Sequence, residues 1–151
     1  MFITSWSKLG AIIAFAARYY GARSVTVASK RTNEKNDLLR YGFNVFDSSI
    51  ETTSDLIRRV TGGHGFDYAF ETSGNSEGYE QVMELVKRGA VIGIMEKSQE
   101  PYTFFVKTAI RSQPRFIGIK EYSDEDKKES ERVLAGGSLF SKLQNDENGG
   151  E

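Results

Sequence analysis

The hexapeptide at positions 5–10, Ser-Trp-Ser-Lys-Leu-Gly, has the spacing of a phosphate-binding turn. Such a turn, G-x-G-x-x-G, joins a strand to a helix and places the pyrophosphate of a dinucleotide against the first N–H groups of that helix. Only the third glycine is kept here, and serines replace the other two. Serine hydroxyls can donate hydrogen bonds to a phosphate. The turn therefore predicts phosphate binding by an altered motif.

Two interpretations of this turn stay open. In the first, the Ser5 and Ser7 hydroxyls hold the phosphates together with the N–H groups of Lys8, Leu9 and Gly10, which face outward at the helix start. In the second, the turn only maintains the fold, because Gly10 is also needed for close packing of the helix on the strand. A serine would add a strain of about 1–2 kcal/mol if either position required a positive φ.

A second candidate segment, Ser29-Lys30-Arg31, ends the next β-rich run. A carboxylate at this place accepts hydrogen bonds from the ribose hydroxyls of NAD and repels a 2′-phosphate. A hydroxyl beside two cations attracts that phosphate instead. If a dinucleotide binds, we therefore expect NADP(H) to be preferred over NAD(H). The alternative is an ordinary solvated loop of mixed charge.

The elements that must position these residues alternate along the chain. The patterns predict strands over 2–4, 24–29, 44–47, 66–71, 90–95 and 115–119, and helices over 8–20, 34–41, 76–87, 102–112 and 124–135, with another helix after Thr53 or Ser54. Thr32 or Asn33 is expected to cap helix 34–41, Gly89 to end helix 76–87, and Ser123 with Asp126 to cap the last helix. Short connections between alternating elements predict an α/β fold with a doubly wound, parallel, six-stranded sheet in three layers.

We expect one domain over residues 1–138 and a flexible polar tail over 139–151, because the chain from Gln144 onward has no apolar residue. The apolar run 9–17 could be the core of a signal peptide, but it is far too short to span a bilayer. A helix explains it better, with Leu9, Ile12, Ile13, Ala16 and Tyr20 on one buried stripe. We therefore predict a cytoplasmic protein that does not bind membranes.

Composition narrows the chemistry further. The 151 residues carry a formal net charge of −1, which gives no electrostatic case for nucleic acid as a partner. The sequence has no Cys and one His, so it contains neither a thiolate nucleophile nor a Cys-built or multi-histidine zinc site. We expect no zinc in this chain.

Four ordered segments, 21–27, 40–44, 60–74 and 85–94, resemble the nucleotide-binding domain of medium-chain, zinc-type alcohol and polyol dehydrogenases. The T-G-G-x-G-x-D-x-x-x-E run that begins at Thr61 is the most specific of them, and the resemblance covers about residues 1–138. It implies a Rossmann-like domain that binds a dinucleotide and pairs through edge strand 115–119 into a homodimer. Nothing in the sequence matches the catalytic zinc domain of that family.

The resemblance also bears on individual residues. It implies that Thr72-Ser73-Gly74 lines the cofactor cleft, so Ser73 and Gly74 join the candidate binding residues. Met95 or Glu96 stands where the family usually has a glycine near the nicotinamide, and either side chain would crowd the ring. Glu34 stands where family members often have a basic side chain, which counts against NADP(H).

Three functions are compatible with these observations. The first is the NAD(P)-binding domain of an alcohol or polyol dehydrogenase-like oxidoreductase, not catalytic on its own. The second is a non-catalytic Rossmann-fold module for interaction or dimerisation that has lost the cofactor. A methyltransferase-like binder is the third and fits least, because it calls for an acidic residue where Ser29 stands.

Overall fold

The computed structural model describes residues 1–95, 101–119 and 122–135. The chain divides into two compact units, Met1–Ile119 and Lys120–Glu151. The first unit contains strands β1 (Phe2–Ile3), β2 (Thr26–Ala28), β3 (Asn44–Phe46), β4 (Phe66–Glu71), β5 (Val86–Ile94) and β6 (Arg115–Gly118). Its helices are α1 (Lys8–Tyr19), α2 (Thr32–Arg40), α3 (Thr53–Thr61), α4 (Ser76–Leu85) and α5 (Val106–Ser112). The second unit contains α6 (Asp124–Ala135).

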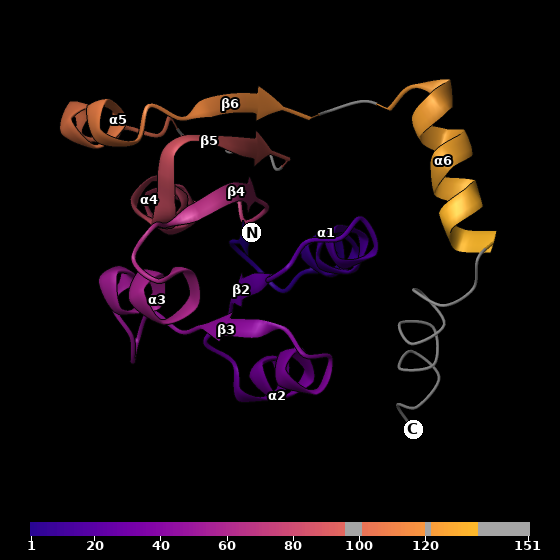
Figure 1. Cartoon of the computed structure of the whole chain (residues 1–151), viewed down its shortest axis with the longest axis horizontal. Helices are drawn as coiled ribbons and strands as arrows, with labels where there is room; N and C mark the ends of the chain where they lie inside the picture. The colour runs from indigo at the N-terminus through magenta and orange to yellow at the C-terminus, as the bar shows by residue number, and fades with distance from the viewer. Residues whose placement is uncertain (96–100, 120–121, 136–151) are drawn as a thin grey trace. The chain divides into compact units, whose positions relative to one another are not determined.

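The six strands form one parallel sheet in the order β3-β2-β1-β4-β5-β6. Phe2 of β1 lies opposite Thr26 of β2 on one side and Ala69 of β4 on the other. Helices α1 and α2 lie on one face of the sheet, and α3, α4 and α5 lie on the other (Figure 1). This arrangement confirms the doubly wound, three-layered α/β fold, and it places the reversal of strand order between β1 and β4.

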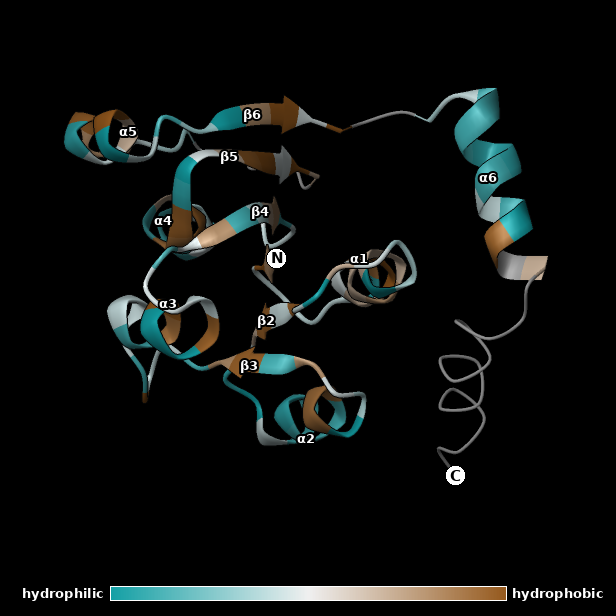
Figure 2. Ribbon diagram, in the orientation of Figure 1, coloured by the Kyte–Doolittle hydropathy of each residue, from teal (hydrophilic) through white to brown (hydrophobic). Residues whose placement is uncertain are grey.

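The core lies between the sheet and its helices, because strands covered on both faces must be apolar throughout. Phe2, Ile3 and Val27 are fully buried, as are Leu56 on α3 and Leu85 on α4. Figure 2 shows the hydrophobic residues concentrated on the strands and on one side of most helices. Burial of each such side chain contributes about 1.5–3 kcal/mol to the stability of the folded state.

The predicted buried stripe on α1 is wrong in part. Ile12 and Tyr20 are exposed, and the buried residues are Gly10, Ala11, Ile13, Ala14 and Phe15. The reason is an aromatic cluster, because the Phe15 ring contacts Phe43 with the ring centroids 5.2 Å apart. Burying Phe15 rotates the apolar face of the helix away from Ile12.

In the ranges that the structure describes, no helix is long and apolar enough to cross a membrane.

The boundary between α4 and β5 also differs from the expectation. The helix ends at Leu85, and β5 begins at Val86, so Gly89 lies inside the strand and does not end the helix. Pairing between β4 and β5 shifts register between Phe66 and Tyr68. Gly89 has a φ of 75°, in the left-handed region, which is typical of a glycine at a β-bulge. Local propensities do not predict a register shift of this kind, because it depends on how β5 pairs with β4.

Helices α2 and α3 begin at other residues than expected, whereas the cap of α6 is as expected. Thr52 caps α3, one residue before the expected Thr53 or Ser54, and α2 begins at Thr32 with Arg31 at its N-cap. The capping box of α6 is confirmed, because Ser123 N–H donates to Asp126 Oδ2 at 2.8 Å and Asp126 N–H donates to Ser123 Oγ at 3.1 Å. The predicted tail over 139–151 lies outside the described residues, and a domain end at 138 stays a prediction.

Candidate functional site

A crevice of about 400 Å³ opens where β1, β2 and β4 end, at the reversal of strand order. Ligands of open α/β sheets bind at this place because two neighbouring loops leave the sheet in opposite directions there. The crevice brings together six of the ten predicted site residues, namely Ser5, Ser7, Ser29, Lys30, Arg31 and Ser73. Of the other four, Lys8 and Gly74 directly follow lining residues in the chain, and Leu9 and Gly10 come next after Lys8.

The turn from β1 to α1 is built without strain at its serines. Ser7 has a φ of −91° and caps the helix, and its Oγ accepts the N–H of Gly10 at 3.1 Å. Within the described ranges, Gln113 is the one non-glycine residue with a positive φ, so the strain considered for Ser5 and Ser7 does not arise. A β-carbon at Gly10 would collide with the Ser5 carbonyl oxygen, which explains why this glycine is kept.

Hydroxyl groups link the two loops across the crevice. Ser5 Oγ lies 2.8 Å from Thr72 Oγ1 and 3.3 Å from Ser7 Oγ. The first N–H groups of α1, at Lys8 and Leu9, have no partner inside their own helix. Hydroxyl donors and helix N–H groups at one place, with the positive end of the helix dipole, suit a phosphate group.

A buried carboxylate, Glu71, shapes the loop after β4. The side chain is fully buried, and its Oε1 accepts hydrogen bonds from Thr4 Oγ1 at 3.1 Å and from the N–H of Ser73 at 2.9 Å. The N–H of Gly74 donates to Oε2 at 3.0 Å, and the Ser73 hydroxyl also donates to Oε1. Glu71 therefore orients Ser73 and Gly74. This role was not predicted from the sequence, although an acidic residue that ends an apolar strand is a usable signal.

Helix α4 approaches this carboxylate closely. A β-carbon at Gly78 would collide with Ser73 Oγ and Glu71 Oε1. Asn75 caps the same helix, with its Oδ1 accepting the N–H of Gly78 at 2.9 Å. Gly78 and the cap residue Asn75 therefore fix how closely α4 approaches the crevice.

At the end of β2, each predicted cation is paired with a carboxylate. Ser29 Oγ donates to Glu34 Oε2 at 2.5 Å, and Arg31 Nη1 lies 3.2 Å from Glu34 Oε1. Lys30 Nζ lies 2.6 Å from Oε1 of Glu77, on α4. Glu34 is close to these residues in the sequence, whereas Glu77 could not be predicted as a partner because 47 residues separate it from Lys30.

Glu77 joins three parts of the crevice. Besides Lys30, its Oε1 accepts from the Ser48 hydroxyl at 2.9 Å and from Gln81 Nε2 at 3.2 Å. The hydrogen bonds from Lys30 and then Ser48 lower the pKa of this carboxyl below its usual value. Gln81 Oε1 is buried and has no hydrogen-bond partner in the part of the chain that the structure describes. This unpaired acceptor in the crevice lining fits a ligand that carries a hydrogen-bond donor.

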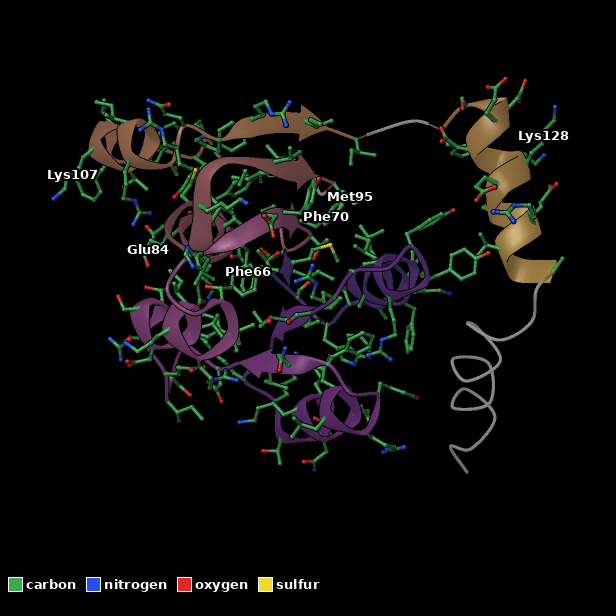
Figure 3. All side chains as sticks on the ribbon, viewed as in Figure 1. Phe66, Phe70, Glu84, Met95, Lys107 and Lys128 are labelled. Carbon is green, nitrogen blue, oxygen red and sulfur yellow. The ribbon has the colours of Figure 1, made fainter. Side chains whose placement is uncertain are left out.

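Met95, one of the two residues expected near a nicotinamide, does not line this crevice. Met95 lines a separate cavity of about 900 Å³ between α1 and the sheet, together with Phe70 (Figure 3). Its N–H donates to the Glu71 carbonyl oxygen at 3.1 Å. That Met95 crowds the ring stays a prediction, and Glu96 lies outside the described residues. Among the described residues, no group of three His, Cys, Asp or Glu could hold a metal ion.

One comparison with known proteins identifies a family, and another shows the same fold in solved structures. A family model described as zinc-binding dehydrogenase matches residues 9–135. The structure resembles 2R,3R-butanediol dehydrogenase from Bacillus subtilis, with 17% identity and a TM-score of 0.81 over 94% of this chain and 41% of that chain. It resembles benzyl alcohol dehydrogenase from Acinetobacter calcoaceticus to the same TM-score and coverage, at 21% identity.

A third similar structure is D-arabinose dehydrogenase from Sulfolobus solfataricus, with 14% identity and a TM-score of 0.81 over 91% of this chain and 43% of that chain. The present chain thus spans about two fifths of the length of these three proteins. At these identities the likeness shows the fold alone. A search of curated proteins gave no match.

Proposed function

Because the chain belongs to the zinc-binding dehydrogenase family, we propose that it binds a nicotinamide adenine dinucleotide in the crevice at the ends of β1, β2 and β4. The observation that carries this proposal is the convergence of the Ser5 and Ser7 hydroxyls, the N-terminus of α1 and the unpaired Gln81 Oε1 on one crevice. When bound, such a cofactor supplies hydride transfer to or from an alcohol or polyol.

The pyrophosphate and the adenine base of the cofactor each have matching residues in the crevice. The pyrophosphate lies against the first turn of α1, where the N–H groups of Lys8 and Leu9 and the Ser5 and Ser7 hydroxyls donate to it. Gln81 Oε1 accepts from the 6-amino group, which is the one hydrogen-bond donor of the adenine base in a nucleotide. The loop that Glu71 orients holds its Ser73 and Gly74 beside the dinucleotide.

The preferred cofactor is NADP(H). Its 2′-phosphate meets the Ser29 hydroxyl and the side chains of Lys30 and Arg31 at the end of β2. The side chain of Arg31 is 79% exposed, so it can turn toward a phosphate without breaking core contacts.

We further propose that this chain does not catalyse the reaction alone. A zinc site of the kind that gives the family its name uses Cys or His ligands, and this sequence offers no Cys and one His. Its part in an oxidoreductase is to hold and orient the dinucleotide.

Titration with NADPH and NADH tests the proposal directly. Trp6 is the single tryptophan and lines the crevice, so its emission reports on the binding site. We expect both cofactors to quench Trp6, with NADPH binding more tightly. Changing Lys30 and Arg31 together to Ala should weaken NADPH more than NADH, whereas Arg40→Ala, at the far end of α2, should change neither. Unchanged emission with either cofactor at millimolar concentration would refute cofactor binding.

Strand β6 favours a second function, assembly into a homodimer. It lies at the edge of the sheet, after Pro114, and all four of its residues are exposed. Phe116 and Ile117, which point to opposite faces, are 44% and 50% exposed. An uncovered apolar edge strand can pair with the same strand of a second copy. We propose this pairing alongside cofactor binding, and as the remaining function should no cofactor bind.

A further inference from the structure

One anionic side chain in the crevice already uses the donors that a ribose phosphate would need. Glu34 lies in the first turn of α2, where the positive end of the helix dipole favours a negative charge. Its Oε2 accepts the Ser29 hydroxyl at 2.5 Å, and its Oε1 lies 3.2 Å from Arg31 Nη1. Its side chain is 22% exposed, so Glu34 is held in the wall of the crevice.

Under the proposed function, the donors that contact Glu34 are also the ones that a 2′-phosphate would need. At the end of the second strand, that phosphate takes hydroxyl and guanidinium donors, here Ser29 and Arg31. The N–H of Arg31 also donates to Ser29 Oγ at 3.2 Å, which keeps this hydroxyl turned toward Glu34. Two anions cannot share one hydroxyl proton and one guanidinium edge at this distance, because the like charges repel.

We propose that Glu34 occupies the position of the cofactor's 2′-phosphate and is a built-in competitor of NADP(H). This inference rests on the proposed function. NADP(H) must displace the Glu34 carboxylate before Ser29 and Arg31 can bind its phosphate. NAD(H) has no such phosphate and leaves the Glu34 contacts in place. Glu34 therefore determines how strongly the crevice discriminates between the two cofactors. Lys30 and Arg31 favour NADP(H), and the carboxylate of Glu34 reduces that preference.

Removing the charge of Glu34 in the full chain tests this role. Glu34→Gln keeps the length of the side chain and an oxygen that can accept from Ser29, but it no longer repels a phosphate. Following Trp6 emission, we expect NADPH to bind about tenfold more tightly, equivalent to about 1.4 kcal/mol. NADH affinity should stay within about twofold, because NADH leaves Ser29 and Arg31 unused. Glu34→Ala should give the same pattern and serves if the Gln variant fails to fold.

Asp37→Asn is the matched control. Asp37 lies on the same helix, and its Oδ1 is 2.7 Å from Arg40 Nη2, outside the crevice lining. The substitution removes one negative charge from α2 without touching Ser29 or Arg31. We expect the affinities of both cofactors to stay within about twofold, so a general charge effect is separated from competition at one position.

The other outcomes are equally informative. An equal gain for NADPH and NADH in Glu34→Gln, or no gain for NADPH, overturns the competition while leaving cofactor binding intact. Weaker NADH binding in this variant also overturns it, because Glu34 would then be an acceptor for the ribose hydroxyls. If neither cofactor quenches Trp6 in the native chain or in the Glu34 variants, the proposed function itself fails.

Discussion

The hydroxyl of Thr4, at the end of β1, donates a hydrogen bond to the fully buried carboxylate of Glu71, at the end of β4, over 3.1 Å. The two residues are 67 positions apart in the chain and meet where the strand order reverses. Thr4 Oγ1 also accepts the N–H of Thr72 at 2.9 Å. The contacts of Thr4 therefore connect the end of β1, which lines the crevice, to the loop after β4.

Glu71 should be a large contributor to stability. Glu71→Ala leaves the buried hydroxyl of Thr4 and the half-buried donors of Ser73 and Gly74 without their acceptor, and each such loss costs about 1–3 kcal/mol. We expect the free energy of unfolding to fall by at least about 3 kcal/mol, measured by urea denaturation. Glu80→Ala, on the exposed side of α4, should change it by less than about 0.5 kcal/mol. Equal stability of the two variants would contradict the role of Glu71.

Ser7 should combine a structural and a binding role. Ser7→Ala removes the acceptor for the Gly10 N–H and should lower the free energy of unfolding by about 1 kcal/mol, while Ser7→Gly lowers it by a few tenths. Thr52→Ala removes the equivalent cap of α3, where Thr52 Oγ1 accepts the Asp55 N–H at 3.1 Å. Both Ala variants should lose similar stability, but only Ser7→Ala should also bind NADPH more weakly. Equal NADPH affinity in the two would rule out the Ser7 hydroxyl as a phosphate donor.

Asp47 should make stability depend on pH in the acid range. Lys35 Nζ lies 2.6 Å from Asp47 Oδ2, and the Ser49 N–H donates to Oδ1 at 3.0 Å. Hydrogen bonds from Lys35 and then Ser49 lower the pKa of this carboxyl to about 2. The unfolded chain has the ordinary pKa of about 3.9.

Because the folded pKa is the lower one, the contribution of Asp47 is fully present above about pH 4 and is lost as the pH falls toward 2. In Asp47→Asn, we expect the free energy of unfolding to lie below that of the native chain at pH 6. The gap should narrow between about pH 4 and pH 2, followed by urea denaturation at each pH. Parallel curves over this range would show that Asp47 is not linked to folding in this way.

We expect Gln81 to recognise the adenine base of the cofactor through its Oε1. Gln81→Leu removes the unpaired Oε1, so binding of NADPH should weaken, and a cofactor with hypoxanthine in place of adenine should bind as in the native chain. Thr26→Val is the matched control, because Thr26 Oγ1 is also buried and unpaired among the described residues but lies outside the crevice lining. It should raise stability and leave both affinities unchanged. Retained adenine preference in Gln81→Leu would exclude Gln81 as the acceptor.

The edge strand β6 should control assembly. If two copies pair along β6, Ile117→Lys puts a charge on the pairing strand and should convert a dimer to a monomer, measured by sedimentation equilibrium. Ile50→Lys changes an isoleucine that is also exposed but precedes α3, and it should leave the dimer intact. A native chain that stays monomeric at high concentration would count against pairing through β6.

The order of the elements and the parallel sheet could be predicted from the sequence, because each depends on local patterns. Strand β4 has the predicted bounds, Phe66–Glu71, since its continuous β-rich run ends where the polar loop begins. The candidate residues at the ends of β1, β2 and β4 followed from the same reasoning. Ends of parallel strands meet at one edge of the sheet, and most of these residues do line one crevice.

Only the tertiary structure decided what surrounds those residues. Local pattern cannot show that Lys30 pairs with Glu77 on α4, that Phe15 rather than Ile12 packs into the core, or that the pairing of β4 with β5 shifts register around Gly89. Each depends on atoms brought together from distant parts of the chain, where burial and charge pairing outweigh local propensity. For the same reason, the sequence determined which residues form the crevice, whereas folding determined which of their hydrogen-bonding groups are already in use.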